Sequence, residues 1–210
     1  FELRAGSGRW LARRILLATG VADELPSIPG LQERWGRSVF HCPYCHGYEL
    51  ARGRIGVIAT GPASLHQAAL LPEWGEVTLF LNGAVTPSAT EVQDLRARGV
   101  AIEPVPIAAI QDAATVRLED GRQLPLAGLF TATRMRPASP LAQQLGCEME
   151  EGPAGLHVRV NAMKETSVPA VFACGDLARP FGNVAMAVGD GAFAGVSVHR
   201  SLVFGLESAA

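Results

Sequence analysis

The residues best suited to chemistry lie in the segment HCPYCHGYE, which runs from His41 to Glu49. The spacing of Cys42 and Cys45 lets their sulfurs close a small, reducible disulfide, and the thiolate that reduction releases is a nucleophile. His46 follows directly, and its imidazole, with an ordinary pKa of about 6.5, can act as general acid or base. A Cys-x-x-Cys pair is nevertheless shared by redox disulfides, haem attachment sites, halves of zinc sites and structural thiols.

The surrounding sequence discriminates among these alternatives. A zinc site needs a second pair of ligands at similar spacing, whereas Cys147 and Cys174 are unpaired, and Cys174 lies in an apolar strand typical of a core thiol. Cys42-Pro-Tyr-Cys45-His46 satisfies the haem attachment pattern, but covalent haem is expected in exported proteins. Glutaredoxins use Cys-Pro-Tyr-Cys at the start of a helix, and here two glycines and a strand soon follow. A redox disulfide is favoured, with two structural thiols in a turn as the alternative.

Composition excludes several classes of partner. The 210 residues are 48% hydrophobic, enough for one large or two small domains with a buried core. The net charge is -2, and no run of Lys or Arg alternates with aromatics, which argues against nucleic acid. The longest apolar stretches fall short of the roughly 20 residues that span a bilayer, so we expect no membrane partner. FELRAGSGRW lacks the order of a signal peptide, which predicts a reducing, cytoplasmic compartment.

Hydrophobic periodicity and turn residues predict alternating strands and helices. The expected elements are a hairpin over 1–12, a buried strand over 12–20, an interdomain crossing over 21–30, a strand–turn–helix over 54–74, a strand over 76–83, a helix over 90–99, a strand over 100–105, a hairpin over 114–126, a strand over 128–137, strands over 156–160 and 170–175, and a helix over 183–205. This order is typical of a nucleotide-binding α/β fold.

Three stretches together resemble a known family: LLATG at 16–20, CPYC at 42–45, and VPAVFACGD at 168–176, followed by a Gly-rich helix. Over nearly its whole length the chain is similar to the thioredoxin-reductase-like branch of the pyridine nucleotide-disulfide oxidoreductases. The resemblance implies an α/β fold in which a Rossmann-like nucleotide-binding insert interrupts a split, three-layer FAD-binding domain. It assigns 1–28 to the tail of the first FAD half, 29–137 to an NAD(P)-binding-like insert that carries the Cys pair, and 138–210 to the second FAD half.

The resemblance also implies that the chain is partial. The family's first βαβ unit, whose Gly-rich turn cradles the FAD pyrophosphate, would precede Phe1. The residues supplied would therefore hold part of an FAD site. Family members are usually homodimers, and we expect the same here.

By the same resemblance, several residues contact FAD. Asp176 would accept a hydrogen bond from the flavin's sugar-like side chain, and Gly175 would let the backbone approach closely. Thr19 and Gly20 would pack beside the cofactor. The alternative for Asp176 is a helix-capping role in a turn.

The start of the final helix is a further candidate cofactor contact. Asn183 can begin this helix, and its first amides, from Val184 onward, would face the flavin pyrimidine, where reduction develops negative charge. Many family members have an Arg-Gln pair where this chain has Gly182 and Asn183. A charged contact to the flavin region is therefore expected to be missing.

The nucleotide turn departs from the dinucleotide-binding pattern. The aligned residues at 59–64 are ATGPAS, which retain Gly61 but lack the first glycine, and Pro62 removes an amide donor. Farther on, LNGAVTPS at 81–88 supplies neither an acid for the ribose nor arginines for a 2′-phosphate. We expect weak or absent NAD(P)H binding; the alternative is that backbone contacts suffice.

These features predict an FAD-dependent thiol-disulfide oxidoreductase that exchanges electrons between flavin and the Cys42–Cys45 disulfide. The family pattern makes Cys45 the flavin-facing thiol and Cys42 the one that exchanges with substrate, and it gives proton transfer to His46, where relatives often have Asp. The expected partner is a thioredoxin-like protein or a small dithiol or disulfide. The alternatives are an oxygen-using dithiol oxidase that does not use NAD(P)H, and a non-catalytic dinucleotide-fold interaction module.

Overall fold

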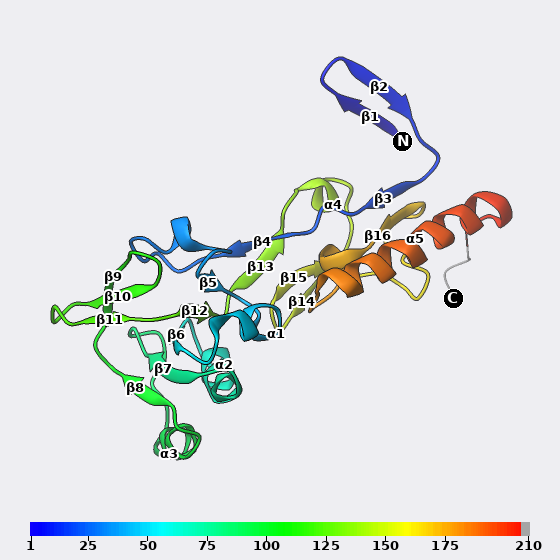
Figure 1. Ribbon diagram of the computed structural model, residues 1–210. Coiled ribbons are helices and arrows are strands. Elements are labelled where there is room, and N and C mark those ends of the chain that lie inside the picture. Colours follow the sequence, from blue (N-terminus) through cyan, green and yellow to red (C-terminus); the bar gives the residue numbers. More distant parts are fainter. Residues whose placement is uncertain (207–210) are drawn as a thin grey trace. The chain divides into compact units, whose positions relative to one another are not determined.

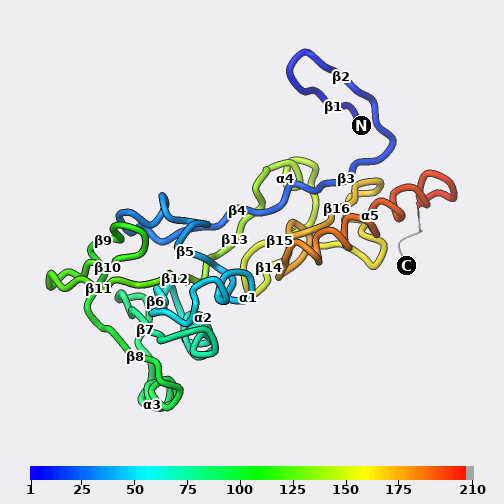
Figure 2. Tube along the Cα trace, in the orientation of Figure 1, coloured from blue at the N-terminus to red at the C-terminus, as the bar shows by residue number. Residues whose placement is uncertain are grey.

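A computed structural model describes residues 1–206. The chain folds into two compact units, shown in Figure 1 and as a trace in Figure 2. One unit combines residues 1–24 with the chain from 134 onward, and the other is the continuous segment 25–133. Among the described residues, no helix is both long and apolar enough to cross a membrane.

The unit of residues 25–133 is built on a parallel sheet. Its strand order is β5 (Val39–Phe40), β12 (Gly128–Thr131), β6 (Arg54–Ile58), β7 (Glu76–Phe80) and β8 (Ala101–Glu103). Every neighbouring pair runs parallel. The central strands are apolar along nearly their whole length, as expected where both faces of a sheet are covered.

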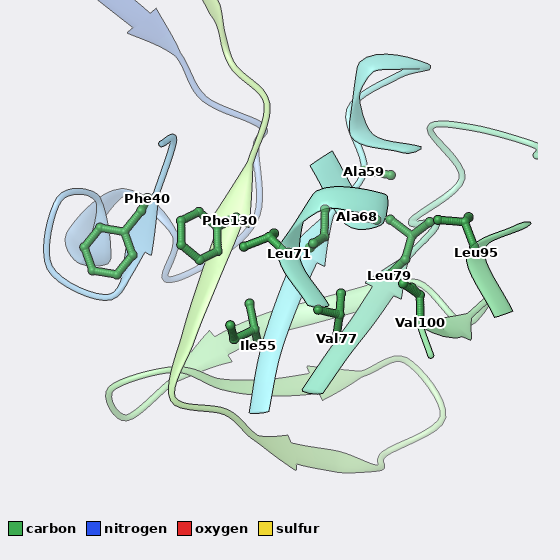
Figure 3. Close-up of a cluster of buried hydrophobic side chains, with 11 residues drawn as sticks. Phe40, Ile55, Ala59, Ala68, Leu71, Val77, Leu79, Leu95, Val100 and Phe130 are labelled. Carbon is green, nitrogen blue, oxygen red and sulfur yellow. The ribbon is translucent and has the colours of Figure 1, made fainter. Parts of the chain in front are cut away.

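Successive strand residues point to opposite faces and enter two separate cores. Phe40, Ile55 and Leu79 pack with side chains of α2 (Ala63–Leu70) and α3 (Ala89–Ala97), as Figure 3 shows. Their strand neighbours Val39, Ile58 and Phe80 pack against an antiparallel sheet made of β9 (Ile107–Gln111), β10 (Thr115–Leu118) and β11 (Gln123–Pro125). The parallel sheet thus lies between helices and a second sheet.

Short turns and helical segments connect these strands. Ser88 caps α3 through a reciprocal capping box with Glu91, and the left-handed Gly99 follows the end of that helix. The hairpin of β10 and β11 turns at Asp120 and Gly121, as predicted. The remaining short helices are η1 (Gln32–Arg34), α1 (Pro43–His46), η2 (Tyr48–Leu50) and η3 (Leu71–Glu73).

The other unit contains a hairpin, a mixed sheet and a small parallel sheet. The hairpin joins β1 (Glu2–Ala5) and β2 (Gly8–Leu11). The mixed sheet has the order β14 (Met149–Gly152), β15 (Gly155–Val158), β13 (Arg134–Pro137) and β4 (Val21–Glu24). The parallel pair is β16 (Val171–Ala173) with β3 (Ile15–Leu17), and the helical segments are α4 (Leu141–Gln144), η4 (Gly175–Ala178) and α5 (Val184–Phe204).

The connections between the units agree with the sequence at one place and differ at another. The interdomain crossing expected over 21–30 contains the boundary between the two units, after Glu24, and its first four residues form β4, which pairs antiparallel with β13. The single strand expected over 128–137 is two strands, β12 and β13, in different sheets of different units. Strand pairing depends on partners far away in sequence, so the local sequence did not show that β12 and β13 join different sheets. The assignment of flavin and nucleotide domains to segments of the chain stays a prediction.

Candidate functional site

The cysteine pair and the nucleotide turn lie at the same edge of the parallel sheet. Cys42 comes just after β5, and Gly61 comes just after β6, with β12 between the two strands. Because all three strands run parallel, their carboxyl ends share one edge, which is where ligands bind in open α/β sheets. The edge therefore brings together a dithiol and a turn of nucleotide-binding type.

The cysteines are held by a single helical turn. Cys42 is the N-cap of α1, and Pro43 occupies the first helical position, which suits proline because its missing amide would have no helical partner. The amide of Gly47 donates to the Pro43 carbonyl at 2.7 Å. A Cβ on Gly47 would come within 2.6 Å of the Trp74 indole, so only glycine fits beneath that ring. The argument that this motif does not open a helix was wrong, although the helix ends at His46.

The two sulfurs interact directly as thiols. The Cys45 thiol donates to the sulfur of Cys42 across 2.8 Å, and both cysteines are unbridged. This hydrogen bond, with burial and the nearby charges of Cys42 and Glu49, raises the pKa of Cys45 to about 11. Cys45 therefore keeps its proton near neutral pH and leaves Cys42 as the acceptor. Cys42 is half-buried and Cys45 is exposed.

His46 lies against an aromatic side chain of the core. Its ring stacks on Phe40 with centroids 4.2 Å apart and planes 20° apart, and Phe40 in turn contacts Phe130. His46 thus shares a helical turn with both cysteines and has a fixed ring plane. Its role in proton transfer stays a prediction.

Two residues at this site, Gln67 and Thr133, were not identified from the sequence. Gln67 of α2 is 9% exposed, and its amide nitrogen donates to the His41 carbonyl at 2.8 Å, next to Cys42. The Gln67 Oε1 is buried with no hydrogen-bond partner among the described residues. The His41 Nδ1 lies 3.4 Å from the hydroxyl of Thr133. A glutamine inside the apolar run of α2 was the available signal, because buried polar side chains usually have a specific partner.

Three amides of the nucleotide turn donate hydrogen bonds within the chain. The Thr60 amide donates to the Ser64 hydroxyl at 3.0 Å, the Ser64 amide donates to Gly61, and the Leu65 amide donates to Pro62. Pro62 itself has no amide. A pyrophosphate normally accepts hydrogen bonds from the amides of such a turn and helix start, and these three amides already have acceptors within the chain.

The position expected to hold the ribose is also engaged elsewhere. The side-chain oxygen of Asn82, just after β7, accepts from the amide of Ile107 at 3.0 Å. The nearest acid along the next strand, Glu103, forms an ion pair with Arg122. The Asn82 side-chain oxygen and the Glu103 carboxylate are therefore both engaged within the chain.

Four residues predicted to contact flavin meet at one edge of the β3–β16 pair. These strands are parallel, Thr19 and Gly20 follow β3, and Gly175 and Asp176 follow β16. Gly20 has a φ of 65° and Gly175 a φ of 68°, a region that other residues adopt only with strain. The two turns therefore lie side by side.

The start of α5 lies next to Asp176. Asn183 caps this helix, as predicted, by accepting from the Met186 amide at 2.9 Å, and Val184 is its first residue. A Cβ on Gly182 would come within 1.8 Å of the Asp176 Oδ1, so glycine leaves the space that this carboxylate occupies. The segment thus combines a carboxylate, a glycine and a helix N-terminus.

The Asp176 carboxylate has capacity for a ligand. Its Oδ1 is buried and has no hydrogen-bond partner in the described part of the chain. Capping is not its role, because Cys174 is the N-cap of η4 and no side chain caps that segment. An acceptor buried without a donor is unfavourable, and a hydroxyl of a flavin's sugar-like chain would satisfy it. The residues present therefore fit FAD.

Comparison with known proteins agrees with this arrangement. The family model described as pyridine nucleotide-disulphide oxidoreductase matches residues 3–191. The chain belongs to this family.

The predicted resemblance to its thioredoxin-reductase-like members is confirmed as well. The chain is 36% identical to thioredoxin reductase sirT of Leptosphaeria maculans, covering 90% of this chain and 63% of that protein. It is 34% identical to thioredoxin reductase tcpT of Claviceps purpurea, covering 99% and 68%.

Solved structures that are similar to this chain confirm the fold class. An oxidoreductase from Agrobacterium tumefaciens is 54% identical with a TM-score of 0.90, covering 94% of this chain and 67% of that one. The crystal structure of HlmI is 34% identical with a TM-score of 0.82, covering 93% and 62%. The chain thus spans about two thirds of the length of its relatives. The predicted mixed α/β, Rossmann-type fold of an oxidoreductase family is confirmed.

Proposed function

We propose that the full-length protein is an FAD-dependent thiol-disulfide oxidoreductase whose redox pair is Cys42 and Cys45. The observation that carries this proposal is the pair itself: two thiols 2.8 Å apart at the carboxyl edge of a parallel sheet, with the proton held on Cys45. When bound, FAD supplies the two-electron chemistry that restores such a pair. Thr19, Gly20, Gly175, Asp176, Asn183 and Val184 are the residues proposed to hold it.

The cysteines exchange disulfides in two steps. The Cys42 thiolate attacks one sulfur of a disulfide substrate, which forms a mixed disulfide and releases one substrate thiolate. Cys45 then gives its proton to a base, proposed to be His46, and attacks the Cys42 sulfur. The second substrate thiolate leaves and the Cys42–Cys45 bond closes. Two electrons pass to the substrate, whose thiolates take up two protons; with a dithiol substrate the steps run in reverse.

A specific observation favours the dithiol direction. The turn around Gly61 spends the Thr60, Ser64 and Leu65 amides inside the chain, and Pro62 has none. Poor NAD(P)H binding would leave a dithiol as the electron source and oxygen as the acceptor. The second candidate is therefore an oxygen-using dithiol oxidase. The proposed substrate is a thioredoxin-like protein or a small dithiol or disulfide. The names of the similar thioredoxin reductases support this thiol-disulfide chemistry. The protein is proposed to act as a homodimer in the cytoplasm.

A trapping experiment tests the role of the pair. Full-length protein with Cys45→Ser is treated with a small aromatic disulfide, and the covalent adduct is located by mass spectrometry. The Cys42 adduct should persist, because the thiol that resolves it is gone, whereas in the unaltered protein it should resolve to the Cys42–Cys45 disulfide. Adducts that persist in the unaltered protein would contradict the proposal, and Cys147→Ser, which changes a buried thiol, is the matched control.

A further inference from the structure

A buried carboxylate of α5 lies directly behind the turn that carries Asp176. Asp190 is 6% exposed, and its Oδ2 accepts from the amide of Gly175 at 2.9 Å. Its Oδ1 receives the ammonium of Lys164 at 2.6 Å and the guanidinium of Arg179 at 3.0 Å. Both oxygens are thus satisfied, and two cations compensate the buried charge. Figure 1 shows α5 beside β16, the strand that leads into this turn.

The backbone around Asp190 adopts conformations that are unfavourable without support. Lys164 has a φ of 64°, in the left-handed region that residues with a Cβ rarely occupy. Its loop is built by Asn161, whose side-chain oxygen accepts from the amides of Met163 and Glu165 at 2.9 and 3.0 Å. The Lys164 carbonyl also accepts from Ala173, the last residue of β16. This loop therefore places a lysine where it meets the carboxylate.

Asp190 is connected through the Gly175 peptide to Asp176, the residue proposed to bind the flavin. Asp190 fixes the Gly175 amide, and Gly175 has the left-handed φ of 68° that sets the direction of the next residue. That next residue is Asp176, whose Oδ1 is buried without a partner in the described chain. The orientation of this free acceptor thus depends on the peptide that Asp190 holds.

We propose that Asp190 is a positioning residue for the cofactor. Its carboxylate, kept in place by Lys164 and Arg179, fixes the Gly175 peptide so that Asp176 presents its free oxygen to the sugar-like chain of the flavin. This inference rests on the proposed function, because it concerns the residues that bind FAD. It assigns a role to a charge cluster that acts on the cofactor site through the Gly175 peptide.

The test separates the hydrogen bond to Gly175 from the burial of charge. Three full-length variants share Lys164→Met, which removes one of the two cations that replacement of Asp190 would leave unpaired. Asp190→Asn retains an oxygen that can accept from Gly175, whereas Asp190→Leu and Asp190→Ala retain none. Each apoprotein is titrated with FAD by flavin fluorescence, and its unfolding temperature and visible circular dichroism with FAD are recorded.

The Leu and Ala double variants should bind FAD about ten-fold more weakly than the Asn double variant, the effect of one lost hydrogen bond to a buried group. Their bound flavin should also show an altered dichroism spectrum, while the apoprotein unfolding temperature should fall by only the few degrees that one unsatisfied buried amide costs. Equal FAD affinity across the variants would overturn the inference alone. Unaltered full-length protein that takes up no FAD would overturn the proposed function, and the inference with it.

Discussion

The position of one proton distinguishes the two cysteines at the level of single residues. The Cys45 thiol donates to Cys42, and with burial and the charges of Cys42 and Glu49 this raises the Cys45 pKa from 9.0 to about 11. A thiol whose folded pKa is raised adds stability that is present below its unfolded pKa and disappears as pH rises from 9.0 toward 11. Reactivity follows the same window, because only the thiolate is alkylated rapidly.

Alkylation of the reduced protein should therefore be ordered by pH. With iodoacetamide at about pH 8, Cys42 should be modified first, and the rate at Cys45 should rise only as pH approaches 11. Cys42→Ala removes the largest cause of the shift, so Cys45 should then react at lower pH. Peptide mass spectrometry over a pH series gives both rates. Faster modification of Cys45 than of Cys42 at about pH 8 would contradict this assignment.

Residues that form ion pairs across long distances in the sequence were hard to recognise from the sequence alone. Asp190, Lys164 and Arg179 are separated along the chain, so no local spacing connects them, although an Asp within the apolar helix α5 was a signal in itself. Gln67 in α2 gave the same kind of signal. In contrast, Cys42 and Cys45 were recognisable because their chemistry depends on short spacing.

The elements were predictable where their hydrophobic period extends over several turns or an uninterrupted strand. The strand, turn and helix of β6 and α2 and the helix α5 were confirmed, since a period near two or 3.6 residues has room to repeat there. The four-residue helix α1 is too short for a period to appear. The break between β12 and β13 arises because the two strands pair with different sheets, which local sequence does not encode.

The start of helix α5 leads to a prediction about FAD affinity. Gly182→Ala puts a Cβ within 1.8 Å of the Asp176 Oδ1, so the carboxylate must move. FAD binding by the full-length apoprotein should weaken about ten-fold, because the moved acceptor no longer meets its donor. Fluorescence titration with FAD measures this.

A second glycine of the same segment serves as the control. Gly189 in α5 has open space where a Cβ would lie and no positive φ. Gly189→Ala should leave FAD affinity unchanged and stabilise the helix by about 1 kcal/mol. Equal affinities in the two alanine variants would contradict the assignment of Gly182 to the cofactor pocket.

The whole molecule combines two groups of candidate residues, one in each unit. The residues that fit flavin follow β3 and β16 in one unit, and the dithiol follows β5 in the other. An electron-exchange enzyme needs both groups, and the family to which the chain belongs is named for pyridine nucleotide and disulphide chemistry. We expect the nucleotide turn to depart from that chemistry, because its Thr60, Ser64 and Leu65 amides donate to groups within the chain.

An anaerobic absorption titration of purified full-length protein tests the central claim most directly. The account predicts a flavin band that a dithiol bleaches, that persists with Cys42→Ala under the same dithiol, and that NADPH bleaches poorly. Saturable bleaching by NADPH at micromolar concentration would contradict the dithiol-oxidase candidate and leave a reductase. A flavin band that the dithiol bleaches equally in the presence and absence of Cys42, or no flavin band at all, would contradict the claim that electrons pass between flavin and the Cys42–Cys45 pair.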